Sequence, residues 1–212
     1  RQAKPINVLR SDTGHSLIAI FEEEIPVELL NRAHSKLTQD AKNIGLVVAG
    51  LGNIGSRFIE LLPAQLHRIP ALDNVHLVGL VGSTKAYFNN DGIDPSEAIT
   101  QFNHRAVDYH EEELIERLAH HPYDELVIVD ITPSESFSNL YREFFQHGIH
   151  VIGANKWAAS SSQDNFDLLN ETAKKHQSQW LGNTTVGAGL PINFAINDLI
   201  NSGDQISEIS GI

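Results

Sequence analysis

The sequence contains no cysteine and no methionine, and only 7% of its residues are aromatic. The absence of cysteine excludes disulfides, thiolate metal sites and cysteine nucleophiles, and is compatible with a reducing cytoplasm. The absence of methionine in a chain that begins at Arg1 indicates a piece of a longer protein, or a sequence from which modified methionines are missing.

Long apolar runs are also missing. None approaches the roughly 20 residues needed to cross a bilayer, and the first residues show no signal-peptide pattern. The net charge is −12 without a basic stripe, which argues against nucleic acid or an anionic membrane as a partner. We therefore expect a cytoplasmic protein. With 212 residues, 41% of them hydrophobic, the chain can form one full domain and part of another.

The most informative segment is a glycine-rich stretch between two apolar runs. Residues 44–49 are apolar and rich in β-branched side chains, as is typical of a strand buried on both faces. Gly50, Gly52 and Gly55 then complete the pattern G-x-G-x-x-G. Apolar residues recur at helical spacing within residues 54–67, which predicts a helix there. A strand that turns tightly into a helix exposes backbone N–H groups at the positive end of the helix dipole. This context predicts a pyrophosphate site in a dinucleotide-binding βαβ unit.

The rest of the pattern predicts an α/β fold, a Rossmann-type doubly wound parallel sheet, because strands alternate with helices. Strands are expected at 44–49, 75–82, 126–131, 149–153 and 179–182, and helices at 54–67, 135–147, 163–176 and after Pro191. A long polar excursion at 83–122 is expected to hold a helix at 95–102, capped by Asp94, and an acidic surface helix at 110–121.

Three parts are expected along the chain. Residues 1–40 contain two short strands (5–10 and 15–21) and a helix (26–40), which are too little to fold alone and indicate the end of an upstream domain. Residues 41–200 form the dinucleotide-binding domain. Residues 201–212 begin a truncated second domain with a strand at 205–212.

The end of the second strand of the βαβ unit indicates the type of cofactor. An NAD site requires a carboxylate there for the ribose 2′-hydroxyl, whereas this chain continues with Gly82-Ser83-Thr84-Lys85. Hydroxyls and a cation suit a 2′-phosphate, so Ser83 and Lys85 predict NADP(H) in preference to NAD(H). The alternative is an ordinary polar turn.

Polar residues also follow the third and fourth strands of the predicted sheet. Thr132 is expected to face the cofactor, and Ser134 to cap the next helix, although both fit a simple turn. Asn155 and Lys156 reach the same edge of the sheet, where a lysine can bind a carbonyl or phosphate or transfer a proton; an exposed lysine is the alternative. The small residues of 184–191 fit a ligand site, a cation site or a crossover between domains equally well.

Four motifs together resemble homoserine dehydrogenase. They are GLGNIGSR (50–57), VDIT (129–132), HVIGANK (150–156) and TVGAGLPIN (185–193). Within that family the chain is most similar to the dehydrogenase part of the bifunctional aspartokinase–homoserine dehydrogenases of the type II, methionine-branch form. The resemblance covers 44–212, and it implies that 1–40 is the end of an ACT-like regulatory region with its linker.

The resemblance implies NAD(P)-dependent interconversion of aspartate 4-semialdehyde and homoserine, in threonine and methionine biosynthesis. Backbone at the glycine turn would hold the pyrophosphate, and Lys156, as the catalytic candidate, would line the nicotinamide end with Thr132. A sodium-type cation would bind backbone carbonyls in the VGAGLP segment. The residues so implied are Gly50, Gly52, Asn53, Ile54 and Gly55 for the pyrophosphate, and Val186, Ala188 and Leu190 for the cation.

Two departures from the family pattern limit these implications. Many members have an acidic residue where this chain has Asn183, so the cation site is expected to be weaker. The family's substrate-binding sheet, its catalytic lysine and aspartate and most of its dimer interface follow the end of this chain. The chain is therefore expected to bind cofactor with little turnover, and the longer enzyme is expected to be a homo-oligomer. The alternatives are a non-catalytic NAD(P)-sensing module and another semialdehyde dehydrogenase.

Overall fold

The computed structural model describes residues 6–10, 17–22, 25–26, 30, 42–182, 184, 187, 190–208 and 210. The chain divides into two compact units, Arg1–Ala41 and Lys42–Ile212. In the first unit, strands β1 (Asn7–Arg10) and β2 (Leu17–Ile20) pair antiparallel, with Asn7 opposite Ile20. This confirms the two predicted strands. The helix predicted for 26–40 lies almost wholly outside the described residues.

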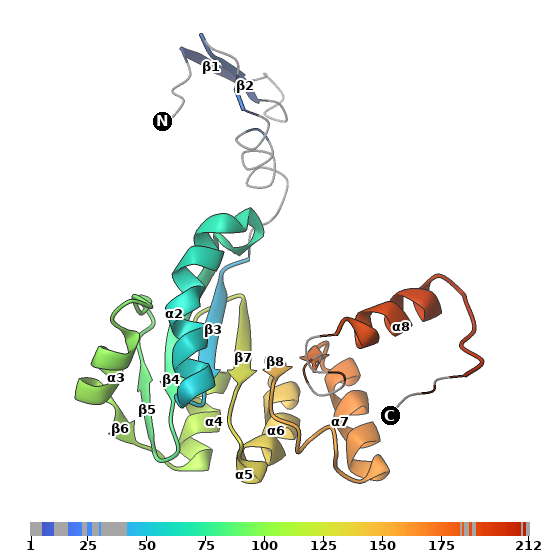
Figure 1. Cartoon of the computed structure of the whole chain (residues 1–212). Helices are drawn as coiled ribbons and strands as arrows, with labels where there is room; N and C mark the ends of the chain where they lie inside the picture. The colour runs from blue at the N-terminus through green and yellow to red at the C-terminus, as the bar shows by residue number, and fades with distance from the viewer. Residues whose placement is uncertain are drawn as a thin grey trace. The chain divides into compact units, whose positions relative to one another are not determined.

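The second unit is built on a seven-stranded sheet with the order β6-β5-β4-β3-β7-β8-β9 (Figure 1). The neighbours from β4 to β9 run parallel, and β5 and β6 are antiparallel additions at one edge. The predicted Rossmann-type α/β fold is thus confirmed. The strands are β3 (Ile44–Ala49), β4 (Val75–Val81), β5 (Lys85–Phe88), β6 (Val107–Asp108), β7 (Glu125–Asp130), β8 (His150–Gly153) and β9 (Trp180–Leu181).

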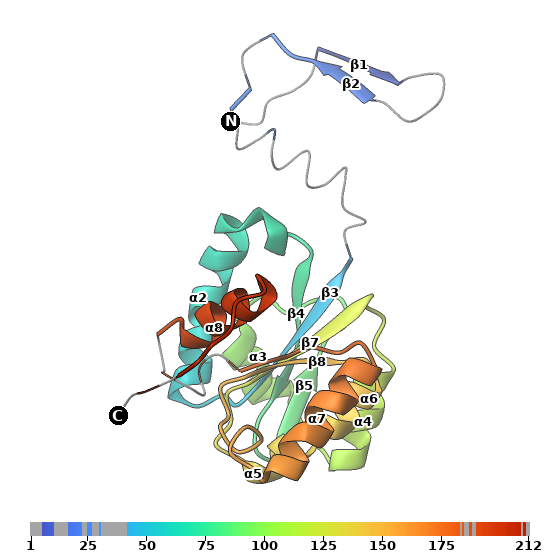
Figure 2. The same ribbon diagram turned by 90° about the vertical axis from the view of Figure 1, so that its right-hand side faces the viewer.

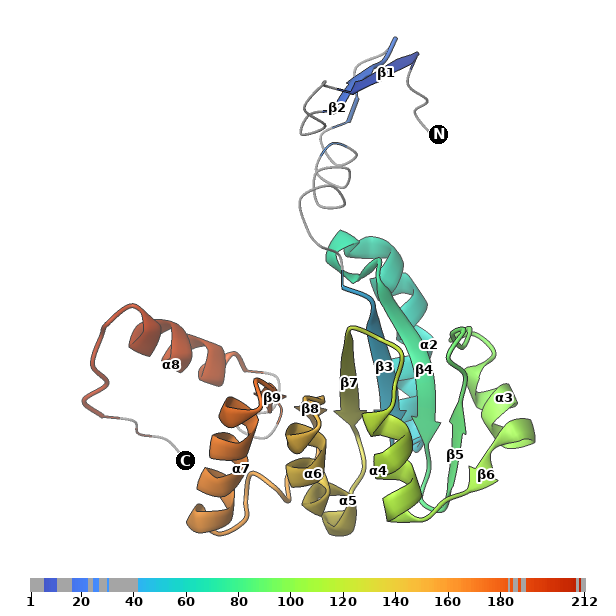
Figure 3. The ribbon, with the colours of Figure 1, turned by 180° about the vertical axis from the view of Figure 1, so that it is seen from behind.

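Helices cover both faces of this sheet, as the views from the side and from behind show (Figures 2 and 3). Helices α2 and α3 lie on one face, and α4, α6 and α7 lie on the other. The shorter α5 follows β7, and α8 has no buried residue. The helices are α2 (Asn53–Arg68), the 3₁₀ turn η1 (Pro70–Leu72), α3 (Ala98–Arg105), α4 (Glu111–Ala119), α5 (Glu135–Asn139), α6 (Tyr141–Gln146), α7 (Gln163–Lys175) and α8 (Ile192–Asn201).

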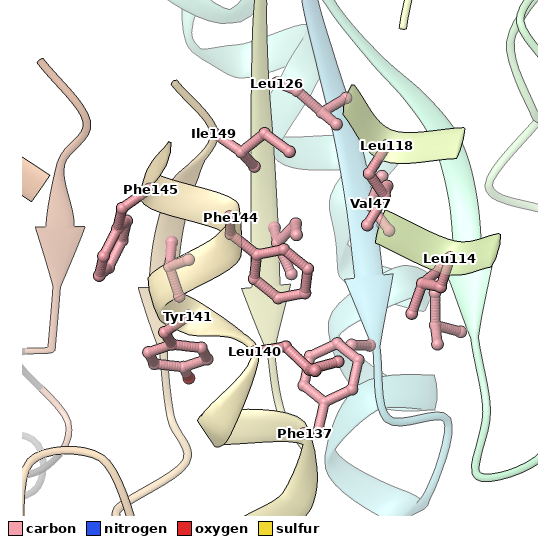
Figure 4. Close-up of a cluster of buried hydrophobic side chains, with 14 of the residues drawn as sticks. Val47, Leu114, Leu118, Leu126, Phe137, Leu140, Tyr141, Phe144, Phe145 and Ile149 are labelled. Carbon is pink, nitrogen blue, oxygen red and sulfur yellow. The ribbon is translucent and has the colours of Figure 1, made fainter. Parts of the chain in front are cut away.

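The apolar run at Ile44–Ala49 forms a central strand because its side chains are buried on both faces of the sheet. Leu46 and Val48 belong to the hydrophobic cluster that includes Ile59 of α2. Val47 belongs to the opposite cluster, which Figure 4 shows, together with Phe144 of α6. Alternate residues of one strand thus join both layers of helices to the sheet.

The predicted polar excursion at 83–122 was wrong in part, because it contains strands β5 and β6. Ser83 and Thr84 form a two-residue hairpin loop, in which the Gly82 N–H donates to the Lys85 carbonyl at 2.8 Å. Ala86 and Tyr87 are buried against the sheet. The burial of these side chains stabilises the antiparallel edge of the sheet. Strands of four and two residues are too short to show the alternating pattern that would predict them from the sequence.

Other predicted boundaries also differ. The helix expected at 95–102 is α3 at Ala98–Arg105, because Asp94 Oδ1 accepts hydrogen bonds from Ser96 and so closes a turn before the helix. The helix expected at 135–147 is divided into α5 and α6 at Leu140. The strand expected at 205–212 was wrong for 205–208, which form no strand.

No helix among the described residues is both long and apolar enough to span a membrane. The assignment of 1–40 to an ACT-like region stays a prediction, as do the boundaries at 41–200 and 201–212.

Candidate functional site

The glycine-rich turn connects β3 to α2 at the carboxyl end of the sheet (Figure 1). Gly50 has a φ of +94°, which favours glycine, and a Cβ there would lie 2.7 Å from the Ile131 carbonyl. A Cβ on Gly55 would lie 1.8 Å from the Gly50 oxygen. Both glycines are therefore required by the close packing of the turn itself.

Gly52 differs from these two glycines, because a Cβ at this position would have no neighbour within 4 Å. Its φ of −70° is accessible to any residue. The first backbone hydrogen bond of α2 runs from the Ser56 N–H to the Gly52 carbonyl at 2.8 Å. The N–H groups of Asn53, Ile54 and Gly55 precede this bond and have no acceptor within the helix. The turn thus offers donors at a helix N-terminus beside open space, which suits an anion such as pyrophosphate.

The turn borders a cavity of about 770 Å³ at the ends of β3, β4 and β7. This volume is in the range of small-molecule and cofactor sites. Its described lining comes from five parts of the chain: Gly50, Leu51 and Gly52; Gly82, Ser83, Thr84 and Lys85; Phe102; Tyr109, His110 and Glu111; and Ile131, Thr132, Pro133, Ser134, Ser136, Phe137 and Leu140.

A buried carboxylate holds the part of the wall that follows β7. Asp130 has no exposed surface. Its Oδ1 accepts from the Thr132 N–H at 2.7 Å, and its Oδ2 accepts from the Tyr141 hydroxyl at 2.7 Å and from Asn155 Nδ2 at 3.0 Å. Three donors on one carboxylate fix the turn after β7 against α6 and against the turn after β8.

Asn155 extends this network toward the cavity. Its Nδ2 also lies 2.7 Å from the Ser134 carbonyl and 3.2 Å from Thr132 Oγ1, and its Oδ1 accepts from the Trp157 N–H at 3.0 Å. The Trp157 indole N–H donates to the Pro133 carbonyl at 3.1 Å. The backbone of 132–134, which forms one wall of the cavity, is thus held by side chains from the β8–α7 turn.

Burial changes the ionisation of this network. The loss of hydration raises the pKa of Asp130 above the ordinary aspartate value, although hydrogen bonds from Thr132, Tyr141 and Asn155 act in the opposite direction. Burial and the neighbouring Asp130 charge both raise the pKa of Tyr141, so that it remains a neutral donor.

The opposite wall is formed by the β4–β5 hairpin and the start of α4. The Tyr109 N–H donates to the Thr84 carbonyl at 3.2 Å, and the Tyr109 hydroxyl donates to the Gly82 carbonyl at 3.1 Å. Burial, and then the negative charge of Glu111, raise the pKa of Tyr109. These contacts place the first residue of α4 next to the hairpin.

The structure brings six of the predicted cofactor-binding residues together around this cavity: Gly50, Gly52, Ser83, Lys85, Thr132 and Ser134. Ser134 also caps α5, since its Oγ accepts from the Phe137 N–H at 3.1 Å. Asn53, Ile54, Gly55, Asn155 and Lys156 are not among the described lining residues. Lys156 is exposed in the turn after β8. Of the predicted cation ligands, Val186 and Ala188 lie outside the described residues, and the Leu190 side chain is exposed.

Sequence reasoning missed several of the residues that form the site. Phe102, Tyr109 and Glu111 line the cavity, although the sequence predicts a polar excursion with an acidic surface helix for their segments. No local signal identifies them, because the hairpin brings them to the cavity. Asp130 did have a signal: a carboxylate directly after the apolar residues 126–129 of a largely buried strand is uncommon and indicates a specific partner.

Comparison with known proteins gives a consistent result. The family described as "Homoserine dehydrogenase, NAD binding domain" matches residues 50–183, which is more than half of the chain. The chain is 41% identical over 205 residues to the bifunctional aspartokinase/homoserine dehydrogenase 2 of Escherichia coli K12. The match covers 96% of this chain and 25% of that relative, so the chain spans about a quarter of the relative's length.

Solved structures share the fold. The homoserine dehydrogenase of Thermoplasma acidophilum superposes with a TM-score of 0.59 at 22% identity, covering 75% of this chain and 49% of that one. A hyperthermophilic archaeal homoserine dehydrogenase in complex with NADPH superposes with a TM-score of 0.58 at 19% identity, covering 72% and 47%. From the family match and the bacterial relative together, this chain belongs to the NAD-binding domain family of the homoserine dehydrogenases.

Proposed function

We propose that this chain binds NADP(H), and more weakly NAD(H), as the cofactor-binding part of a homoserine dehydrogenase. The observation that carries the proposal is the glycine-rich turn, which opens the N-terminus of α2 onto the 770 Å³ cavity. The open space beside Gly52 fits the close approach of a pyrophosphate to the backbone. The archaeal relative that was solved with NADPH supports the choice of cofactor.

Each wall of the cavity has a role in this proposal. The N–H groups from Gly52 to Gly55, including those of Asn53 and Ile54, bind the pyrophosphate. Ser83 and Lys85 bind the 2′-phosphate, since they lie on the hairpin that follows β4. Thr132 and Ser134 border the nicotinamide end, where Asn155 Nδ2 donates to the Ser134 carbonyl and to Thr132 Oγ1.

The reaction proposed for the longer enzyme is the interconversion of aspartate 4-semialdehyde and homoserine in amino-acid biosynthesis. The bound nicotinamide supplies or accepts the hydride. Lys156 is the proposed catalytic residue of this part of the enzyme, and backbone carbonyls of Val186, Ala188 and Leu190 remain the proposed cation ligands. We expect the 212-residue chain to bind cofactor with little turnover, and the longer enzyme to be a cytoplasmic homo-oligomer.

Calorimetric titration of the chain with NADPH and with NADH tests this proposal. Saturable binding of NADPH at lower concentration than NADH is the expected result. Trp157 gives a second readout. Its indole N–H donates a hydrogen bond to the carbonyl of Pro133, which lines the cavity, so we expect its fluorescence to change when cofactor binds. If neither nucleotide binds, the cofactor assignment is wrong for this chain.

Substitution of Gly52 by alanine should separate binding from folding. We expect the affinity for NADPH to fall at least tenfold, about 1.4 kcal/mol, because the added methyl group occupies the space beside the proposed pyrophosphate site. The free energy of unfolding should change by less than about 1 kcal/mol, since a Cβ meets no protein atom there and Ala is only a moderately poorer N-cap than Gly. Titration calorimetry and urea denaturation measure the two effects. An unchanged affinity for NADPH would contradict the placement of the pyrophosphate at this turn.

A further inference from the structure

The cavity carries one charged residue of each sign among its described lining residues. Lys85 lies at the start of β5, and Glu111 is the first residue of α4. The sequence has no acid directly after β4, where a carboxylate would bind the 2′-hydroxyl of an NAD ribose. The structure brings a carboxylate to the same cavity from a different element.

The position of Glu111 is set by contacts on both sides. Tyr109, two residues earlier, donates from its N–H to the Thr84 carbonyl at 3.2 Å and from its hydroxyl to the Gly82 carbonyl at 3.1 Å. The helix start is fixed by a capping box, in which Glu113 Oε2 accepts from the His110 N–H at 3.3 Å. The first residue of α4 is therefore held beside the hairpin that carries Ser83 and Lys85.

The charge on this side of the cavity is not simply positive. Lys85 stands directly opposite Asp108 in the β5–β6 register, so an acidic residue is its cross-strand neighbour, although Asp108 is not among the described residues that line the cavity. Glu111 supplies the carboxylate among the described lining residues of the cavity, and its charge reaches far enough to raise the pKa of Tyr109. A 2′-phosphate bound at the hairpin would therefore meet one lysine and one carboxylate among the described residues that line the cavity.

We propose that Glu111 is a specificity-determining residue of the cofactor site, which accepts a hydrogen bond from the ribose 2′-hydroxyl of NAD(H) and repels the 2′-phosphate of NADP(H). The inference rests on the proposed function. Its consequence is that Ser83 and Lys85 give only a limited preference for NADP(H), and that the same cavity admits both cofactors.

The substitution Glu111→Gln tests this role, and Glu112→Gln is the matched control. Glu112 is the next residue of α4, is also exposed, and is not among the described residues that line the cavity. Both variants remove one negative charge from the first turn of the same helix. Any general effect of net charge or of the helix dipole should therefore appear in both.

Dissociation constants for NADPH and NADH are measured on the unaltered chain and on both variants at low ionic strength. Glu111→Gln should raise the ratio of NADPH affinity to NADH affinity about three- to tenfold, as expected for one partly screened charge, and high salt should reduce this gain. Glu112→Gln should change the ratio less than about twofold. An equal ratio in the two variants would refute the role of Glu111 while leaving the proposed function intact. Failure of the unaltered chain to bind either nucleotide would overturn both proposals.

Discussion

Substitution of Gly55 by alanine is expected to lower the free energy of unfolding by about 3 kcal/mol, at the upper end of overpacking costs. A Cβ on Gly55 would lie 1.8 Å from the Gly50 oxygen, which is a backbone atom and cannot rotate away. Gly50 in turn lies against the Ile131 carbonyl and the Thr132 nitrogen. The added methyl group must therefore displace the β3–α2 turn or the start of α2, and we expect NADPH binding to be lost with it.

Urea denaturation of Gly55→Ala measures this effect, with Gly52→Ala as the control. Both variants add one methyl group within the same glycine motif, but the group at position 52 enters open space. The two substitutions should thus affect different properties: stability and binding at Gly55, binding alone at Gly52. Equal stability of the two variants would contradict the packing role assigned to Gly55.

The central part of the fold could be predicted because its signals are local. Every residue of 44–49 that is buried in the sheet is apolar. The glycines that follow have the spacing of a tight turn into a helix. Parallel strands then bring their carboxyl ends to one edge, which places Thr132 and Ser134 near the glycine turn without any knowledge of side-chain contacts. Both residues line the cavity as this reasoning predicts.

The remaining wall of the cavity could not be predicted, because it depends on contacts between segments distant in sequence. After the Gly82–Lys85 hairpin the chain runs antiparallel to β4. The Tyr109 hydroxyl, 27 residues after Gly82, donates a hydrogen bond to the Gly82 carbonyl in that hairpin. The Asp130–Tyr141 bond spans 11 residues and the Asp130–Asn155 bond 25. Side-chain networks of this kind leave no period in the sequence, even though one of their members, Asp130, stands out by its position.

Substitution of Asp130 by alanine is expected to lower the free energy of unfolding by about 3 kcal/mol, because buried donors left without an acceptor cost about 1–3 kcal/mol each and the costs are not additive. The donors concerned are the Thr132 N–H and the Tyr141 hydroxyl, whereas Asn155 Nδ2 keeps the Ser134 carbonyl and Thr132 Oγ1 as acceptors. Tyr141→Phe, which removes one donor and keeps the ring, should cost only about 1 kcal/mol. Urea denaturation of the two variants gives both values, and an Asp130→Ala variant no less stable than Tyr141→Phe would contradict the network.

The same substitution is expected to weaken the binding of NADPH. Thr132 loses the carboxylate that accepts from its N–H, and Asn155, which holds the Ser134 carbonyl, loses one of its own partners. The turn at 132–134 forms a wall of the cavity, so its disorder should reduce affinity even though Asp130 itself is not among the described lining residues.

The pH dependence of stability should reveal the ionisation of Asp130. Burial raises its pKa in the folded chain above the value in the unfolded chain. Between these two pKa values the folded state binds more protons than the unfolded state, so the contribution of Asp130 to stability falls as pH rises through this window and is constant above it. The variant Asp130→Asn has no titrating group at this position. The stability of the unaltered chain minus that of Asp130→Asn should therefore decrease from about pH 4, near the ordinary aspartate pKa, and then level off. A difference that increased with pH would mean that the three hydrogen bonds outweigh burial, and that the network favours the carboxylate over the acid.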